Sequence, residues 1–296
     1  MLFSLTSRQR GNTGDQPSPV SALIPAPCWA LTSERSVMTT DPYRLAGHNQ
    51  ARVYDDLGGG KDALAPQRKV AQNLTTHLPG LRDAVRDNRA FLDEAVVMLA
   101  RGGIDQFIDL GAGFPRTGPN LHHIAREHAP DARMVYVDYD VPVVAHWRAQ
   151  LKGYGLAAVE RDARRPVEVL SAYETQMLID IDRPVGLIMG LLLHFWTDEE
   201  LQQVLDIYLQ ALASGSGLVI SHATTTGLTA EQLDAAVKEY EQPIYPRSEQ
   251  EITALFDGVD LMPPGVVAVR DWPLRRIDDD KPPLFLGGVA LIRDRR

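Results

Sequence analysis

The stretch Phe107-Ile108-Asp109-Leu110-Gly111-Ala112-Gly113 is the strongest structural signal in this chain. The apolar residues around Asp109 predict a short buried strand, and the two glycines that bracket Ala112 predict a tight turn with a helix soon after it. Glycine has no side chain, so such a turn lets a ligand lie directly against the backbone. The carboxylate of Asp109 can order the amides of the turn or hold a cationic group of a ligand. Because ligands of open α/β sheets bind at this end of the strands, the stretch predicts a nucleotide-like cofactor site.

The spacing of the glycines distinguishes between cofactors. A dinucleotide fingerprint requires Gly-x-Gly-x-x-Gly, and the sixth position counted from Gly111 is Arg116, so the fingerprint fails. The pattern Asp-x-Gly-x-Gly after a strand is instead the one associated with S-adenosylmethionine (SAM) methyltransferases. Small glycine turns are common, so this interpretation needs support from residues further along the chain.

From Gln106 onward the sequence alternates between strand-like and helix-like segments. Strands are expected at 106–110, 134–137, 157–160, 185–189 and 217–221, with helices at 120–128, 141–152, 167–178 and 201–213 between them. Units of this length predict a parallel sheet with helices on both faces. Helices are then expected at 229–240 and 247–256, and strands at 265–269 and 284–292. The last two strands would form a terminal hairpin at the edge of the sheet.

Two further acids come after the second and third of these strands. The carboxyl ends of parallel strands share one edge of the sheet, so Asp138 and Asp162 are expected near Asp109. Asp138 can accept both hydroxyls of a cofactor ribose, and Asp162 or the neighbouring amide of Ala163 can reach an adenine edge. Each acid alone could equally cap a helix or lie in a loop. Together, in this order, the three acids predict SAM.

A family resemblance rests on several separate motifs. They are Ala51-Arg52-Val53-Tyr54-Asp55, Gly59-Gly60-Lys61-Asp62, Asn88-Arg89-Ala90-Phe91-Leu92, Asp109-Leu110-Gly111-Ala112-Gly113, Val135-Tyr136-Val137-Asp138, Leu193-His194-Phe195 and Ser221-His222-Ala223. From about Asp41 to the C-terminus the chain resembles a bacterial family of SAM-dependent methyltransferases whose substrates are mostly unassigned. It departs from the family at Asp56-Leu57-Gly58, where a more apolar run is usual.

The resemblance implies the class I, Rossmann-like methyltransferase fold. This is an α/β fold with a seven-stranded doubly wound sheet, an antiparallel last strand and an N-terminal helical cap. Residues 1–37, rich in Ser and Pro, are expected to be a disordered extension. Residues 38–103, with helices expected at 51–57, 66–77 and 81–101, would form the cap, and residues 104–296 the SAM-binding domain.

These motifs also assign the site residues. Asp109, Gly111 and Gly113 are assigned to the methionine end of SAM, Asp138 to its ribose, and Asp162 with Ala163 to its adenine; Gly190, after the fourth strand, is also expected to border the cofactor. The cap would contribute Tyr54, Lys61, Asn88 or Arg89 to the substrate. For the arginine, a solvated helix face paired with aspartates is the alternative.

Methyl transfer itself demands few protein groups. The sulfonium of SAM is already an activated methyl donor, so the protein must align an acceptor and exclude water. A base helps where the acceptor is a hydroxyl or an ammonium group. His194, just beyond the fourth strand, is the first candidate, and His222, after the fifth, is the second; a histidine bonded within the core is the alternative for each. No spacing of His, Asp or Glu predicts a metal site.

Composition narrows the class of partner. The 296 residues carry a net charge of −9 with 44% hydrophobic residues, which is typical of a globular protein and argues against nucleic-acid or membrane binding. The single cysteine, Cys28, fits a reducing cytoplasm. The apolar run 185–193 is shorter than the ~20 residues that span a bilayer, and no signal peptide is recognised. We therefore expect a small-molecule acceptor, with natural-product tailoring as a guess and a homodimer among the open options.

Two other functions compete with this one. An NAD-dependent oxidoreductase is disfavoured by Arg116 and by the lack of a catalytic Tyr-x-x-x-Lys set. A protein with the same fold that binds SAM without transferring its methyl group would have the same cofactor loop, and the sequence does not distinguish it.

Overall fold

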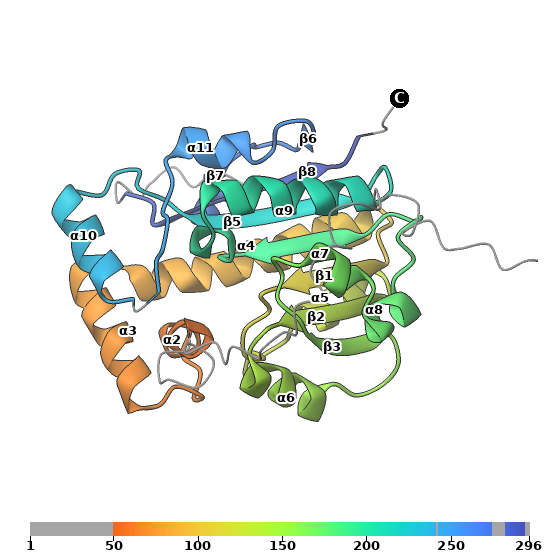
Figure 1. Ribbon diagram of the computed structural model, residues 1–296, viewed down its shortest axis with the longest axis horizontal. Coiled ribbons are helices and arrows are strands. Elements are labelled where there is room, and N and C mark those ends of the chain that lie inside the picture. Colours follow the sequence, from red (N-terminus) through yellow and green to blue (C-terminus); the bar gives the residue numbers. More distant parts are fainter. Residues whose placement is uncertain (1–49, 241, 274–281, 294–296) are drawn as a thin grey trace, which may run out of the picture. The chain divides into compact units, whose positions relative to one another are not determined.

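One mixed β-sheet forms the centre of the structure (Figure 1). The computed structural model describes residues 50–240, 242–273 and 282–293, so the expected extension over residues 1–37 lies outside the described residues. The strands are β1 (Gln106–Leu110), β2 (Arg133–Asp138), β3 (Leu156–Glu160), β4 (Gly186–Gly190), β5 (Gly217–Ala223), β6 (Asp260–Leu261), β7 (Val267–Ala268) and β8 (Phe285–Leu291). Their order is β3-β2-β1-β4-β5-β8-β6, and β7 also pairs with β8.

The direction of the strands confirms the expected fold class. β1 to β5 pair in parallel, and β8 runs antiparallel beside β5, with Gly217 opposite Leu291. The expectation of a terminal hairpin at the sheet edge was wrong in one respect. β8 lies inside the sheet, because the short strands β6 and β7 both pair with its outer side, at Ala290 and Leu286 among other positions. β6 and β7 together occupy the seventh position of the sheet.

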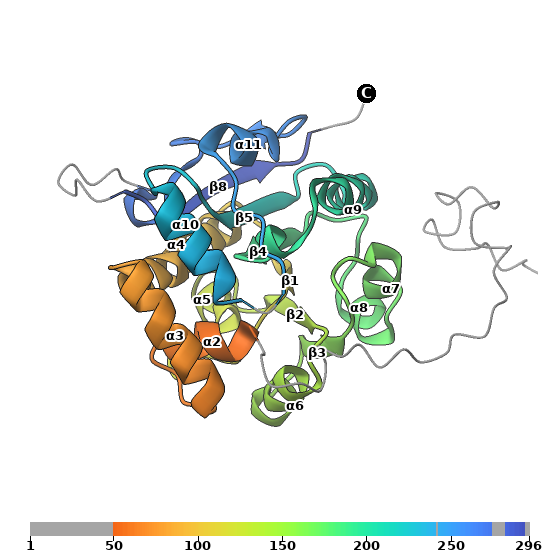
Figure 2. The same ribbon diagram turned by 60° about the vertical axis from the view of Figure 1, so that its left-hand side comes forward.

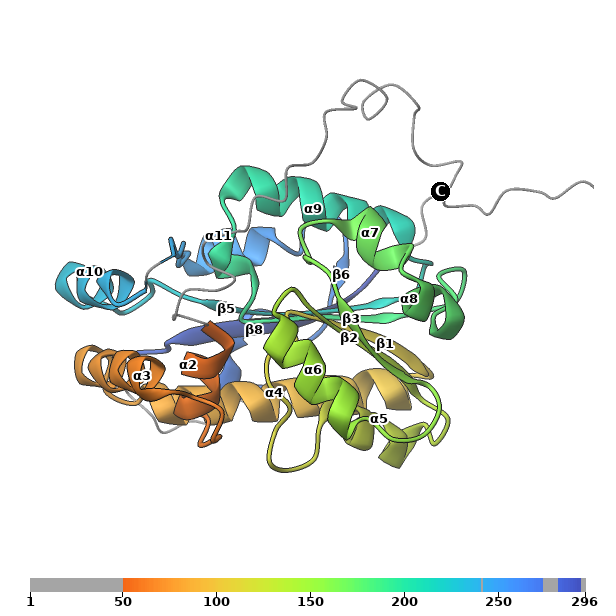
Figure 3. The ribbon, with the colours of Figure 1, turned by 60° about the horizontal axis from the view of Figure 1, so that its bottom comes forward.

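Helices cover both faces of this sheet (Figure 3). On one face lie α4 (Leu81–Arg101), α5 (Leu121–His128) and α6 (Val141–Gln150); on the other lie α7 (Pro166–Leu170), α8 (Tyr173–Leu178), α9 (Asp198–Ala211) and α11 (Glu249–Ala254). The side chains of β1 alternate between the two cores: Ile108 and Leu110 pack with α7 to α9, and Phe107 packs with α4 and α5. This alternation is a consequence of the two-residue period of a strand.

Two helix boundaries differ from the sequence-based expectation. The single helix expected at 167–178 is two short helices, α7 and α8, because the backbone at Ala172 is extended (φ −59°, ψ 139°). Helix α9 begins three residues earlier than expected. Thr197 is its N-cap, and the hydroxyl of Thr197 accepts the backbone N–H of Glu200, which satisfies one amide of the first turn.

A cap of helices lies at one end of the sheet (Figure 2). It contains α2 (Gln50–Leu57), α3 (Ala65–His77) and the first half of α4. It also contains α10 (Ala230–Lys238), whose Ala236 is buried in the same apolar cluster as Val53 and Leu74. The cap therefore combines segments from both halves of the sequence.

Helix α4 belongs to the cap and to the sheet layer at once. Its first turns bury Leu81 and Val85 against α2 and α3, and its last turns bury Ala95 and Leu99 against the sheet. The apolar stripe read from its sequence is thus confirmed as a buried face. The expected domain boundary near residue 103 falls at the end of this shared helix.

Candidate active site

The glycine turn after β1 is hydrogen-bonded to the end of β2. Gly111 and Gly113 have φ angles of +67° and +62°, which L-residues with side chains rarely adopt. The amides of Gly111 and Ala112 donate to the carbonyl of Val137 at 2.8 and 3.1 Å, and the amide of Gly113 donates to the carboxylate of Asp138 at 3.0 Å. Of the two roles considered for Asp109, ordering these amides is therefore not the one observed.

An aromatic pair supports this turn. The indole of Trp147, on α6, donates to the carbonyl of Gly113 at 2.7 Å and stacks on the ring of Tyr136, with centroids 3.7 Å apart. The hydroxyl of Tyr136 in turn contacts Nδ1 of His122 at 2.7 Å. Trp147 could not be recognised as a site residue from the sequence, since a single tryptophan inside a helix belongs to no motif of fixed spacing.

Asp109 is a buried carboxyl without a hydrogen bond to the part of the chain that the structure describes. It is 8% exposed, and burial raises its pKa to about 7, against the opposing influence of the Arg116 guanidinium. A carboxylate held in this way is available to a cationic group of a ligand.

Asp138 combines burial with hydrogen bonds from backbone amides. Burial raises its pKa to about 6, although the amides of Asp140 and Gly113 donate to it and lower the pKa. Each of its oxygens accepts one of these amides and keeps a lone pair for a ligand.

Asp162 is already occupied. Arg164 donates to both carboxylate oxygens, with Nη2 at 2.8 Å from Oδ2 and Nε at 3.1 Å from Oδ1. The neighbouring amide of Ala163 has no partner among the described residues. Of the two groups considered for an adenine edge, the amide is the one that is free.

Replacing Asp109 with Asn is expected to change stability and cofactor binding in opposite directions. The folded-state pKa of Asp109 lies above its unfolded value of about 3.9, so the charged group opposes folding at pH above about 7 and costs nothing below about pH 4. The variant should raise Tm by roughly 4–8 °C at pH 8, on the assumption of about 2 kcal/mol, with little change at pH 4. Its affinity for SAM at pH 8 should fall about 10-fold. Scanning calorimetry at the two pH values measures Tm, and titration with SAM measures the affinity. A lower Tm at pH 8 would contradict the description of Asp109 as a buried carboxylate without a partner.

One cavity of about 610 Å³ connects the glycine turn to the cap. Cofactor sites of proteins have volumes of this order. The predicted site residues that line it are Tyr54, Asn88, Arg89, Asp109, Gly111, Gly113, Asp138, Asp162, Ala163, Gly190 and His194. The remaining two do not line it: Lys61 is exposed on the surface, and His222 is fully buried behind the cavity wall.

His194 and His222 differ in their hydrogen bonding. His194, in the short 3-10 helix η2 (Leu193–Phe195), lines the cavity, and its Nδ1 has no partner among the residues described. Burial lowers the pKa of His194 well below its usual range, so the ring is neutral and can accept a proton or a hydrogen bond. In His222, Nδ1 contacts the carbonyl of Ala223 at 2.7 Å and Nε2 contacts Arg247 at 2.8 Å. Both nitrogens of His222 are thus used by the protein.

Arg247 holds the segment that carries His194. Its side chain is buried and donates to the carbonyls of Leu193 and Trp196, at 3.2 and 3.0 Å, as well as to His222. It also forms an ion pair with Asp198, at 2.6 Å. Arg247, which lies just before α11, thus links the segment after β4 to the end of β5.

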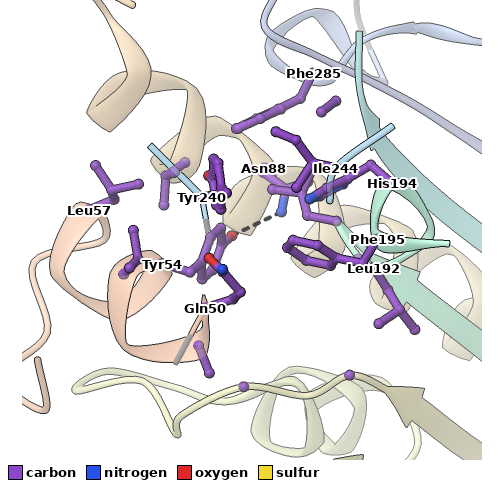
Figure 4. A pocket seen from close by; sticks show the side chains of 18 of the residues that line it. Gln50, Tyr54, Leu57, Asn88, Leu192, His194, Phe195, Tyr240, Ile244 and Phe285 are labelled. Atoms are coloured by element: carbon purple, nitrogen blue, oxygen red, sulfur yellow. Dashed lines mark hydrogen bonds between the residues drawn. The ribbon is translucent and has the colours of Figure 1, made fainter. Parts of the chain in front are cut away.

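The cap side of the cavity is aromatic with a few polar groups (Figure 4). The amide of Asn88 donates to the hydroxyl of Tyr54 at 2.9 Å, and Tyr240 also lines this part of the cavity (Figure 4). The guanidinium of Arg89 lies over the ring of Tyr54, 5.5 Å from its centre, and donates to the carbonyl of Gly58.

The described ranges contain no group of three or more His, Cys, Asp or Glu side chains that could hold a metal ion. Within the same ranges, no helix has the length and apolarity needed to cross a membrane.

The donors and acceptors around the cavity fit SAM. A free carboxylate at Asp109 suits the ammonium of the methionine part, Asp138 has lone pairs for hydroxyl donors, and the amide of Ala163 suits a ring nitrogen of adenine. The doubly wound sheet with its inserted antiparallel strand and this cavity define a class I SAM-dependent methyltransferase.

The chain belongs to the S-adenosyl methyltransferase family, whose sequence profile matches residues 40–292. A candidate methyltransferase from Thermobifida fusca is similar to it, with 33% identity and a TM-score of 0.79 over 88% of this chain and 100% of the other. A DUF574 family protein from Streptomyces avermitilis is 32% identical, with a TM-score of 0.77 over 82% of this chain and 97% of the other. No curated protein matches the chain significantly. The class of enzyme and its cofactor agree with the expectation from sequence.

Proposed function

We propose that this enzyme methylates a small-molecule acceptor and that His194 takes up the proton of the acceptor. The observation that supports this most directly is the continuous cavity, which extends from the strand-end carboxylates to the helices of the cap. His194 lies between these two parts in sequence and structure, after β4 and beside the cap residue Tyr240 through Phe195. The net charge of −9 argues against a nucleic-acid acceptor.

Each group has a role in this proposal. Asp109 with the turn at Gly111 and Gly113 holds the methionine part of SAM, Asp138 the ribose, and the amide of Ala163 beside Asp162 the adenine; Gly190 borders the cofactor. When bound, SAM supplies a methyl group activated by a positively charged sulfur. The protein then needs to align the acceptor with this methyl group and to exclude water, and we assign both tasks to the cap.

The proposal is tested by titrating the protein in parallel with SAM, S-adenosylhomocysteine (SAH) and NAD, and then by measuring transfer of a labelled methyl group from SAM to a panel of small hydroxyl and amine compounds. We expect micromolar binding of the two adenosyl compounds, no binding of NAD, and transfer to some members of the panel. Binding of NAD alone would overturn the proposal. Binding of SAM without transfer to any acceptor would favour a protein that binds the cofactor without methylating.

Replacing His194 with Ala is expected to lower kcat by about 10²–10⁴-fold, the usual contribution of a general base. The affinity for SAM should change less than about threefold, because the strand-end carboxylates and the glycine turn remain. His128→Ala, a histidine of α5 that does not line the cavity, is the control and should keep full activity. Single-turnover rates and titration with SAM separate the two effects. An unchanged kcat in His194→Ala would remove His194 from the mechanism.

A further inference from the structure

The side chains that line the cap side of the cavity indicate which kind of acceptor fits there. We infer that the acceptor is a neutral, mainly apolar molecule whose aromatic hydroxyl lies between Asn88 and His194. This inference rests on the proposed function, because it assigns the acceptor of the same site.

The wall of this part of the cavity is apolar and rich in aromatic rings. It includes Tyr54, Leu57, Leu81, Phe195, Tyr240 and Phe285. These side chains come from α2, α4, η2, the segment after α10 and the start of β8, so they surround the space from several sides (Figure 4). Aromatic rings on opposite sides favour a flat apolar molecule between them.

The two charged side chains on the cap side both hydrogen-bond to the protein, although Nε of Arg89 has no partner among the described residues. Asp55 accepts the amide of Asp62 at 2.9 Å, and Arg89 donates to the carbonyl of Gly58 at 2.9 Å. The two charges also attract one another, so they offset each other in this region. The other charged side chains that line the cavity lie at the strand ends, in the loops next to them and, for Glu200, in the first turn of α9. A charged acceptor would have to enter the apolar cap side of the cavity without a counter-ion of its own, which costs free energy.

Four buried polar atoms on residues that line this cavity lack a partner in the described ranges: Oδ1 of Asn88, Nδ1 of His194, Oε1 of Gln50 and Nε of Arg89. Asn88 is 1% exposed, and its Oδ1 accepts no hydrogen bond from the described residues, since the amide nitrogen alone is bonded to Tyr54. His194 is 7% exposed, and its Nδ1 is likewise unpaired. Buried polar groups are normally hydrogen-bonded, so three unpaired atoms that can accept and one that donates, all on residues lining one cavity, indicate a ligand whose polar group both donates and accepts. A hydroxyl supplies the donor and is also the nucleophile.

The reaction balances with these groups. The hydroxyl oxygen of the acceptor forms a bond to the methyl carbon, and the bond from that carbon to the sulfur breaks. The electron pair stays on sulfur, so the sulfonium becomes the neutral thioether of SAH. The hydroxyl proton passes to His194 and then to solvent, and no oxidant or reductant is needed.

Three flat compounds of similar size test the inference on the SAH-loaded protein by calorimetry. They are 2-naphthol, 2-methoxynaphthalene, which lacks the donor, and 6-hydroxy-2-naphthoate, which adds a charge. We expect 2-naphthol to bind at least about 10-fold more tightly than the other two, since the ether leaves the buried acceptors unpaired and the carboxylate brings an unpaired charge. Equal or tighter binding of the carboxylate, or of the ether, would overturn the inference.

The variant Asn88→Leu sharpens the test. It should reduce the preference for 2-naphthol over the ether by at least about fivefold, while its affinity for SAH stays within about threefold. The control Gln72→Leu removes an exposed side-chain amide of α3 outside the cavity and should keep the preference. An unchanged preference in Asn88→Leu would overturn the role of Asn88. If the unmodified protein does not bind SAH, the proposed function is overturned as well. If it binds SAH but does not prefer 2-naphthol over the other two compounds, this inference alone is overturned.

Discussion

Replacing Asp138 with Ala is expected to weaken SAM binding by about 100-fold or more. A charge-assisted hydrogen bond contributes about 1.5–3 kcal/mol, and two ribose hydroxyls would donate to this carboxylate. The same carboxylate accepts the amides of Gly113 and Asp140, so its loss also releases the glycine turn from β2. Titration calorimetry with SAM measures the change in Kd.

Asp162→Asn is the matched control for this variant. Its carboxylate is occupied by Arg164, and the free group beside it is the amide of Ala163, which the substitution keeps. The loss of SAM affinity should therefore be less than about fivefold. If Asp138→Ala bound SAM as tightly as the unmodified protein, the ribose assignment would be wrong. If Asp162→Asn lost more affinity than Asp138→Ala, the carboxylate of Asp162 would be the main cofactor contact.

Replacing Arg247 with Leu is expected to have the largest effect on stability. The variant leaves the carbonyls of Leu193 and Trp196 and the ring of His222 without their buried donor. Removing one partner from a buried charged network costs about 3–5 kcal/mol. For a domain of this size the corresponding fall in Tm is roughly 10 °C.

Arg183→Leu provides a control on an exposed pair. Arg183 and Asp105 bond at 2.8 Å on the surface, where water and salt screen such pairs, so Tm should change by less than about 3 °C. Arg247 is a positioning residue for His194, and Arg247→Leu should also lower kcat at temperatures below its own Tm while SAM affinity changes little. A fall in Tm without any fall in kcat would restrict Arg247 to a structural role.

The sheet and the cofactor side could be predicted because their signals are local. The apolar runs of β1 to β5 and the acids after them come in the order of the chain, and the glycine turn has a fixed spacing. Asp109 and Asp138 line the cavity where the sequence placed them. Even so, the sequence did not show that Asp138 rather than Asp109 binds the amide of Gly113, since both carboxylates are close enough in any such fold.

The contacts between distant segments could not be predicted. His222 was a candidate base because of its place after β5, and only the structure shows Arg247 bonded to it. Helix α10 is amphipathic like many others, and nothing in its sequence indicates that Ala236 is buried against α3 rather than the sheet. Lys61 comes after a glycine turn that resembles a ligand loop, yet the turn is held by Asp55 and the lysine lies outside the cavity.

The two halves of the shared helix α4 are expected to tolerate different substitutions during evolution. Its 21 residues run without a break from the cap side of the cavity, at Val85 and Asn88, to the sheet, at Ala95 and Leu99. If the acceptor binds there as proposed, substitutions in its first turns should alter which compound is methylated without disturbing the core of the cofactor domain. A lineage can diversify its chemistry at one end of the helix while selection for folding acts on the other, and a protein engineer who seeks a new acceptor can restrict a mutant library to that first half.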